Sequence, residues 1–221
     1  MLARDVISED VPPIRPNESI NKALVWMDDF KVSHLPVVDG KKFIGILSED
    51  DILGLPHAED CSVKDCEIEL KKIFVTENQH VFDVIKTISD FHLTVIPIIR
   101  DNDEYIGCVT NAHLMHVIAE MSVVRDLGGI IELEMNVRDY YFSQIARVIE
   151  ENDAKILGAF ITSPPDTTKM NLTIKVNTYE IDGIIQSFER LGYTVVGSYG
   201  SNVYDEDFRE RLDEFFKYLN I

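Results

Sequence analysis

The stretch SHLPVVDGKKFIGILSEDDI, residues 33–52, returns 61 to 62 residues later as TVIPIIRDNDEYIGCVTNAHL, residues 94–114. Upstream of it, an offset of 61 aligns Asn17 with Asn78 without a gap. Self-similarity at such a period marks two copies of one supersecondary unit, and two such units most easily bury their apolar faces against each other. We therefore expect the two copies to fold as one module.

The composition is that of an acidic globular protein. Among 221 residues, 39 Asp and Glu outnumber 21 Lys and Arg, for a formal net charge of -18, and 45% of the residues are hydrophobic. This charge repels phosphate backbones and anionic lipids, so we expect no nucleic-acid partner and no membrane partner. No apolar run approaches the roughly 18 residues of a spanning helix, and charges such as Arg4 and Asp5 interrupt any signal-peptide core. We expect a cytoplasmic protein.

The three cysteines, Cys61, Cys66 and Cys108, are an odd number and contain no C-x-x-C pair. This pattern predicts a reducing compartment, no disulfide, and thiols that pack as small hydrophobic groups.

Within each copy the periodicity changes in a fixed order. Residues 18–31 place apolar side chains at helical spacing. Residues 35–38 and 43–47 are rich in β-branched residues and flank Asp39-Gly40, a dipeptide typical of hairpin turns. Ser48 then starts a second, short helix. The second copy repeats the order with a longer turn.

This order resembles the CBS domain, named after cystathionine β-synthase. The specific pattern is an apolar-Pro-apolar-apolar strand, here LPVV at 35–38, and a strand that ends GILS at 45–48, followed by Asp51. The resemblance covers roughly the first 120 residues. It implies two βαββα-type repeats, at residues 1–58 and 59–122, in an α+β fold.

In the CBS family two repeats form a disc whose central clefts bind adenosine-containing ligands. The resemblance therefore implies a regulatory ligand of the AMP, ATP, NAD or S-adenosylmethionine class. It assigns phosphate to Ser48 and ribose to Asp51. His34 stands two positions before Pro36, where the family often carries a basic residue that points at phosphate.

The local chemistry of these residues also fits a ligand. A strand that ends where a helix begins presents backbone N–H groups and a hydroxyl, and the helix dipole favours an anion there. A carboxylate one turn later can accept both hydrogen bonds of a ribose diol. Ser48-x-x-Asp51 is also a capping box, which explains both residues without a ligand, and the two roles can coexist. Capping does not explain why Gly45 and Pro36 recur in the second copy.

The second repeat departs from this pattern. Thr110 preserves the hydroxyl, but His113 replaces the acid and Val95 stands where His34 stood. We expect the first cleft to dominate. His113 and His116 lack a third ligand at metal-site spacing, so we expect no metal centre.

From residue 128 to residue 200 the pattern predicts a second domain of the split βαββαβ, ferredoxin-like order. Attached to a CBS pair, this order resembles an ACT domain, a small regulatory fold that often binds amino acids at subunit interfaces. Arg138 and Asp139 are the candidates for an amino acid's charges. Phe142 stands near the position at which amino-acid-binding members of the family usually carry a glycine. The alternatives are that the domain serves assembly and that Arg138 and Asp139 are simply solvated loop residues.

A C-terminal amphipathic helix is predicted at residues 205–221. Its apolar stripe can cover the core of its own domain or a subunit contact.

The chain offers no nucleophile with a base, no metal centre and no carboxylate pair in a cleft, so we do not expect an enzyme. The leading hypothesis is a regulatory sensor that binds an adenosyl ligand and acts through a homodimer on an unidentified regulated protein. The alternative is a ligand-free dimerisation scaffold. Some proteins that resemble this layout are acetoin-utilisation accessory proteins, although no residue indicates that pathway.

Overall fold

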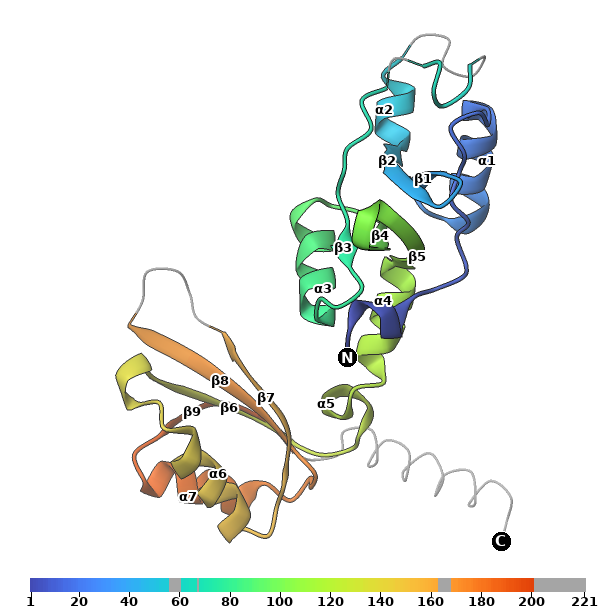
Figure 1. Cartoon of the computed structure of the whole chain (residues 1–221). Helices are drawn as coiled ribbons and strands as arrows, with labels where there is room; N and C mark the ends of the chain where they lie inside the picture. The colour runs from blue at the N-terminus through green and yellow to red at the C-terminus, as the bar shows by residue number, and fades with distance from the viewer. Residues whose placement is uncertain (56–60, 67, 163–167, 201–221) are drawn as a thin grey trace, which may run out of the picture. The chain divides into compact units, whose positions relative to one another are not determined.

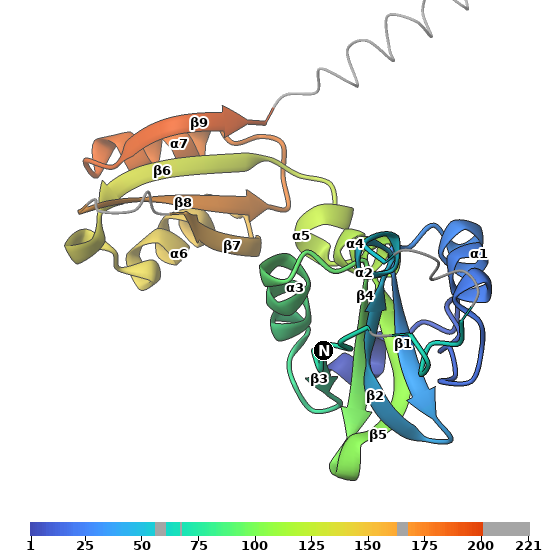
Figure 2. The same cartoon turned by 90° about the horizontal axis from the view of Figure 1, so that it is seen from above.

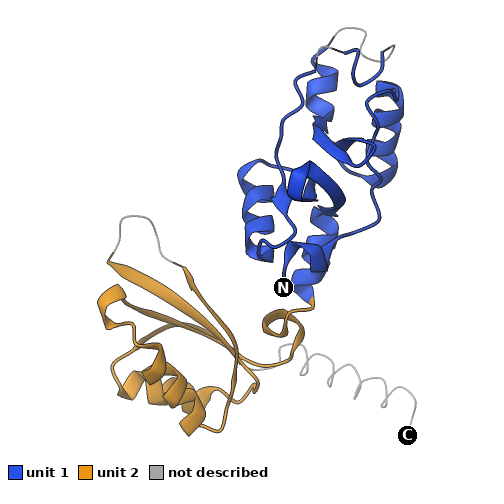
Figure 3. Ribbon diagram, viewed as in Figure 1, with its two compact units in different colours: residues 1–119 blue, residues 120–221 orange. Residues whose placement is uncertain are grey.

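The computed structural model describes residues 1–55, 61–66, 68–162 and 168–200. The chain divides into two compact units, Met1–Ala119 and Glu120–Ile221 (Figure 3). The helix predicted for residues 205–221 lies outside the described residues. In the described parts of the chain, no helix combines the length and the apolar character needed to span a bilayer.

Unit 1 contains the two repeats (Figure 1). The elements of the first are η1 (Ala3–Val6), α1 (Ile20–Phe30), β1 (His34–Asp39), β2 (Lys42–Ser48) and α2 (Glu49–Leu53). Those of the second are β3 (Val75–Thr76), α3 (Val81–Asp90), β4 (Val95–Arg100), η3 (Asp101–Asp103), β5 (Glu104–Thr110) and α4 (Asn111–Ala119). The predicted order of helix, hairpin and helix is therefore present in both copies.

The two hairpins share one register. β1 pairs antiparallel with β2 and places Pro36 opposite Ile46, while β4 pairs with β5 and places Pro97 opposite Cys108. Each ladder shifts register at the same point, after Val37 and after the equivalent Ile98. The sheet of unit 1 runs in the order β1-β2-β5-β4-β3, so β2 and β5 join the repeats (Figure 2).

The segment that leads into each repeat crosses the hairpin of the other repeat. Ile46 N–H donates to the carbonyl of Lys71 at 2.9 Å, and Ser8 N–H donates to the carbonyl of Cys108 at the same distance. A Cβ added to Gly45 would lie 2.7 Å from Leu70 Cβ. A Cβ added to the equivalent Gly107 would lie 2.5 Å from Ile7 Cγ2. The recurrence of these glycines therefore has a packing cause that needs no ligand.

The core of unit 1 lies between the sheet and the helices. Its largest fully buried side chains include Ile14, Ile20, Leu35, Phe43 and Ile96. The helix starts are capped by side chains. Ser19 Oγ accepts from Lys22 N, and His80 Nδ1 accepts from Phe82 N. These caps replace hydrogen bonds that the first helical turn cannot make internally.

Unit 2 consists of α5 (Ser122–Arg125), β6 (Ile130–Asn136), η4 (Val137–Asp139), α6 (Phe142–Glu151), β7 (Ile156–Thr162), β8 (Lys169–Val176), α7 (Asp182–Arg190) and β9 (Thr194–Tyr199). The sheet order is β7-β8-β6-β9 with antiparallel neighbours. Helices α6 and α7 cover one face, toward which Ile131, Leu133 and Met135 alternate (Figure 1). From β6 to β9 this is the β-α-β-β-α-β order that the sequence predicts.

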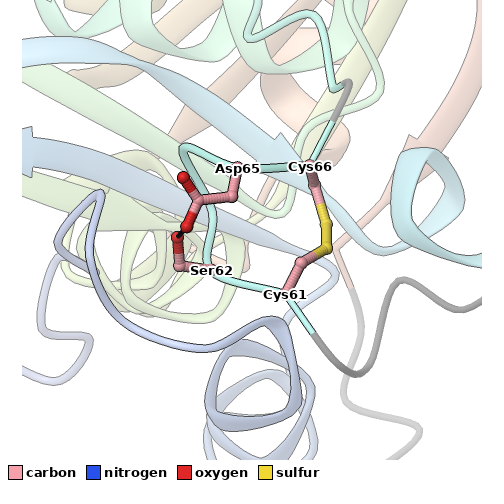
Figure 4. Close-up of a disulfide and its surroundings, with 4 residues drawn as sticks. All are labelled: Cys61, Ser62, Asp65 and Cys66. Carbon is pink, nitrogen blue, oxygen red and sulfur yellow. Dashed lines mark hydrogen bonds between the residues drawn. A yellow bond between two sulfur atoms is a disulfide. The ribbon is translucent and has the colours of Figure 1, made fainter.

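The prediction that no disulfide forms is wrong. Cys61 and Cys66 are disulfide-bonded with Cα atoms 5.9 Å apart (Figure 4). Cys108 is a buried free thiol. The cause is a local turn at residues 61–66, in which Cys66 N–H donates to the carbonyl of Ser62 at 3.1 Å. The turn brings together two cysteines that lack C-x-x-C spacing. The cysteine pattern therefore no longer argues for a reducing compartment.

Candidate ligand-binding cleft

A cavity of about 250 Å³ lies in unit 1 and is lined by both repeats. Three predicted site residues, His34, Ser48 and Asp51, line it together. The full lining is His34, Ile46, Ser48, Asp50, Asp51, Lys71, Ile73, Phe91, His92 and Leu93. Pro36 is buried in β1 and is not among the lining residues. Its place is therefore within the strand.

Ser48 is the N-cap of α2. Its Oγ accepts a hydrogen bond from the backbone N–H of Asp51 at 3.1 Å, so capping occurs as the alternative interpretation expects. The first turn of α2 carries three carboxylates, those of Glu49, Asp50 and Asp51. A hydroxyl that accepts one bond still has its own hydrogen to donate, so capping leaves Ser48 able to contact a ligand.

His34 connects the two repeats. Its Nδ1 accepts from the backbone N–H of Thr94 at 3.3 Å and lies 3.0 Å from the Thr94 hydroxyl. This contact places the proton of the neutral ring on Nε2. Burial lowers the pKa of His34 from its ordinary value, and this outweighs the opposing effect of Asp50 and Asp51. At neutral pH the ring therefore lacks the positive charge that the family often places here.

Lys71 supplies a basic side chain that the sequence analysis missed. It belongs to the segment that crosses β2, and its carbonyl accepts from Ile46 N–H. Phe91 and His92, at the end of α3, were also missed. The available signal was the repeat itself, since Phe91 aligns with Phe30. The position of Lys71 in the cavity, by contrast, depends on the crossing of its segment over β2, which no local pattern predicts.

The second repeat places its candidate residues differently. Thr110 is buried, and its Oγ1 accepts from the backbone N–H of His113 at 3.1 Å. Val95 is fully buried, and the buried Ser8 takes the position of Lys71 in the equivalent crossing. Burial raises the pKa of the neighbouring Cys108 thiol to about 11. Within the described residues, no group of three His, Cys, Asp or Glu side chains could hold a metal ion.

Unit 2 has a wider groove of about 800 Å³. Asp139 lines it but Arg138 does not, and both are exposed. The Asp139 carboxylate accepts from Asn136 Nδ2 at 3.2 Å. Phe142 occupies the first position of α6 and is 40% exposed. The two predicted charges therefore do not converge on one cavity, and the groove is the weaker candidate.

The sequence pattern of the CBS domain family matches residues 3–57 and 63–120, which together are just over half of the chain. The chain belongs to the CBS domain family, and unit 1 is the CBS domain pair.

The curated relatives are longer proteins. A homoserine O-acetyltransferase of Methanobrevibacter ruminantium is 28% identical over 116 residues, which are 52% of this chain and 24% of the relative. The chain thus spans about a quarter of the length of the first curated relatives that it matches.

Several solved structures match about half of this chain at low identity. A CBS domain pair/ACT domain protein of Thermotoga maritima is 19% identical, with a TM-score of 0.48 over 54% of this chain and 98% of that one. A Vibrio cholerae protein assigned to acetoin utilization is 17% identical, with a TM-score of 0.47 over 53% and 90%. The CBS domain pair of protein MJ0100, solved with 5′-methylthioadenosine and S-adenosyl-L-methionine, is 24% identical, with a TM-score of 0.44 over 54% and 96%.

Proposed function

We propose that this protein is a regulatory sensor whose unit 1 cleft binds an adenosine-containing small molecule. The carrying observation is that His34, Ser48 and Asp51, which the CBS resemblance selects from sequence, line one cavity. That cavity also contains an apolar wall and an exposed aromatic ring from the second repeat, at Leu93 and Phe91. Mixed apolar and polar linings of this kind are typical of small-molecule sites.

Each part of an adenosine has a counterpart in the lining. The Asp51 carboxylate accepts the two hydrogen bonds of the ribose diol. The Ser48 hydroxyl donates a further bond while its oxygen continues to cap α2. The Phe91 ring, which is 54% exposed, provides a face on which a base can stack.

Signalling follows from the shared lining. Ser48 and Asp51 belong to the first repeat, whereas Phe91 and Leu93 belong to the second. A ligand that contacts both repeats binds one arrangement of the pair more tightly than another and shifts the population toward it. The regulated partner is a protein that recognises that arrangement. A cytoplasmic location and a role outside catalysis stay predictions.

Thermal unfolding with adenosyl ligands tests the proposal. A ligand at about 100 times its dissociation constant stabilises the folded state by roughly 2.7 kcal/mol. Asp29→Asn, on the exposed surface of α1, is the matched control for Asp51→Asn because it removes one carboxylate away from the cleft. Absence of any shift with adenosine, AMP, ATP, NAD or S-adenosylmethionine would reject the sensor function.

A second candidate function is a dimerisation scaffold. Large apolar side chains stand exposed on the helices of unit 1, with Phe82 at 63% on α3 and Met115 at 66% on α4. Exposed apolar groups of this size favour a protein contact when they gather on one surface. We expect a homodimer for both functions, since two-fold assemblies are the commonest closed oligomers. Light scattering tests this, and a mass near that of one 25.2 kDa chain at micromolar concentration would contradict it.

Unit 2 is proposed to be an ACT-like assembly domain. The order β6-α6-β7-β8-α7-β9 supports this assignment. Arg138 and Asp139 remain the candidates for an amino-acid ligand, although Phe142 at the start of α6 blocks the close backbone approach that a glycine permits there. A calorimetric titration with the common amino acids tests the ligand, and heat lost in Asp139→Asn would support it.

A further inference from the structure

The unit 1 cleft carries an excess of negative charge. Asp50 and Asp51 line it directly, and Glu49 precedes them in the first turn of α2. Among the lining residues that the structure describes, Lys71 is the only lysine or arginine. His34 adds no full charge at neutral pH because burial lowers its pKa. His92 lies on the exposed rim.

The start of α2 is also poorly suited to a phosphate. The N–H of Glu49 donates to the carbonyl of Ser33 at 2.9 Å, and the N–H of Asp51 donates to Ser48 Oγ at 3.1 Å. Two of the amides that could bind an anion at a helix start therefore already have partners inside the protein. The helix itself is only five residues long. The geometry thus weakens the phosphate contact that the sequence assigns to Ser48.

We infer that this cleft selects an uncharged or cationic adenosyl compound over nucleotides that carry a phosphate chain. The inference rests on the proposed function, because it concerns the 5′ substituent of the same ligand. Asp50 and Asp51 line the same cavity of about 250 Å³, so a ligand whose ribose binds Asp51 shares that cavity with two carboxylates. A phosphate chain is repelled by these negative charges, whereas a cationic sulfonium or amine is attracted.

Isothermal titration of the full chain at constant ionic strength tests the inference. The probes are adenosine, 5′-methylthioadenosine, S-adenosylmethionine, AMP and ATP without magnesium. We expect each of the first three to bind at least about tenfold more tightly than ATP, with AMP between them. If ATP or AMP binds most tightly, the inference is wrong and the proposed function stands. If no probe binds, the proposed function fails and the inference falls with it.

Two charge variants separate electrostatic selection from shape. Asp50→Asn keeps the size of the side chain, so it should improve the affinity for ATP about tenfold relative to that for adenosine. Lys71→Gln should weaken AMP severalfold relative to adenosine. Asp29→Asn should leave every ratio unchanged, since it removes the same charge outside the cleft. An unchanged ratio of ATP to adenosine affinity in Asp50→Asn would overturn charge as the selector.

Discussion

The two repeats of unit 1 share a backbone but not a set of cleft side chains. Pro36 and Pro97 occupy matching places in the two hairpins, and Ser48 and Thr110 cap the helices that follow. At the candidate cleft positions, the first hairpin has Asp51, His34 and the crossing residue Lys71, whereas the second hairpin has His113, Val95 and the crossing residue Ser8.

This difference shows which residues the fold requires and which it leaves free. The caps, the crossing glycines and the strand prolines serve the packing, so both copies keep them. The second hairpin has a different residue in place of each of the acid, the imidazole and the lysine, so the shared backbone does not require those side chains. The first cleft is therefore the place to look for a ligand.

The largest expected loss of stability comes from a substitution at Gly45, where the segment that carries Lys71 crosses β2. In Gly45→Ala the new Cβ would lie 2.7 Å from Leu70 Cβ and 3.2 Å from Leu70 backbone atoms. Overpacking against backbone should lower the free energy of unfolding by about 3 kcal/mol. Gly40→Ala is the control. It has a φ of +63° and no atom within 4 Å, so its cost is conformational alone, about 1 kcal/mol. Chemical denaturation measures both, and equal losses would contradict the crossing.

Substitution of Asp51, the carboxylate proposed to bind the ribose, distinguishes the two clefts. Asp51→Asn keeps the size of the side chain but removes charge-assisted hydrogen bonds, so it should weaken an adenosyl ligand by about 1.5 to 3 kcal/mol with little loss of stability. His113→Ala, at the equivalent position, should weaken it less. Calorimetric titration of both variants is the measurement. Unchanged affinity in Asp51→Asn with a large loss in His113→Ala would assign the ribose to the second repeat.

The disulfide adds a further asymmetry, because it closes the turn that precedes the Lys71 segment. Replacing Cys61 and Cys66 together by serine should lower the free energy of unfolding by about 2 kcal/mol, as expected for a loop this short. Cys108→Ser is not a matched control because that thiol is buried. The control is instead wild type with and without a reductant. Two free thiols at 61 and 66 in unreduced protein, with no effect of reductant on the melting temperature, would contradict the bond.

Much of the fold follows from local patterns. The hairpin around Asp39-Gly40 and the helix at 18–31 follow from turn chemistry and periodicity, which are properties of neighbouring residues. Ser48, Asp51 and His34 could be selected because the repeat and the CBS pattern mark them. Lys71 could not, since its place in the cleft depends on a segment that crosses the hairpin of the other repeat.

Two inferences from the sequence change for physical reasons. The recurrence of Gly45 favoured a nucleotide cleft, but the close approach of Leu70 explains that glycine by packing. The phosphate contact at Ser48 assumed free amides at the helix start. The structure shows the Asp51 amide bonded to Ser48 and the Glu49 amide bonded to Ser33. The approach of Leu70 to Gly45 and the bond from Glu49 to Ser33 are tertiary contacts that a single stretch of sequence does not report. The bond from Asp51 to Ser48 is the capping contact that the sequence already indicates.

The smallest expected effect concerns His34, whose counterpart is Val95. Burial lowers the pKa of His34 in the folded protein, so the unfolded chain binds a proton more readily. Above the pKa of His34 in the unfolded chain, about 6.5, the neutral ring does not reduce the free energy of unfolding. The free energy of unfolding decreases as the pH falls from that value through the lower pKa of the folded protein. His34→Val copies the second repeat and removes this group. Denaturation between pH 8 and pH 5 should show that the wild type loses stability relative to the variant only on the acidic side. A constant difference across that range would mean that the buried imidazole does not titrate differently on folding, and that His34 and Val95 differ in packing alone.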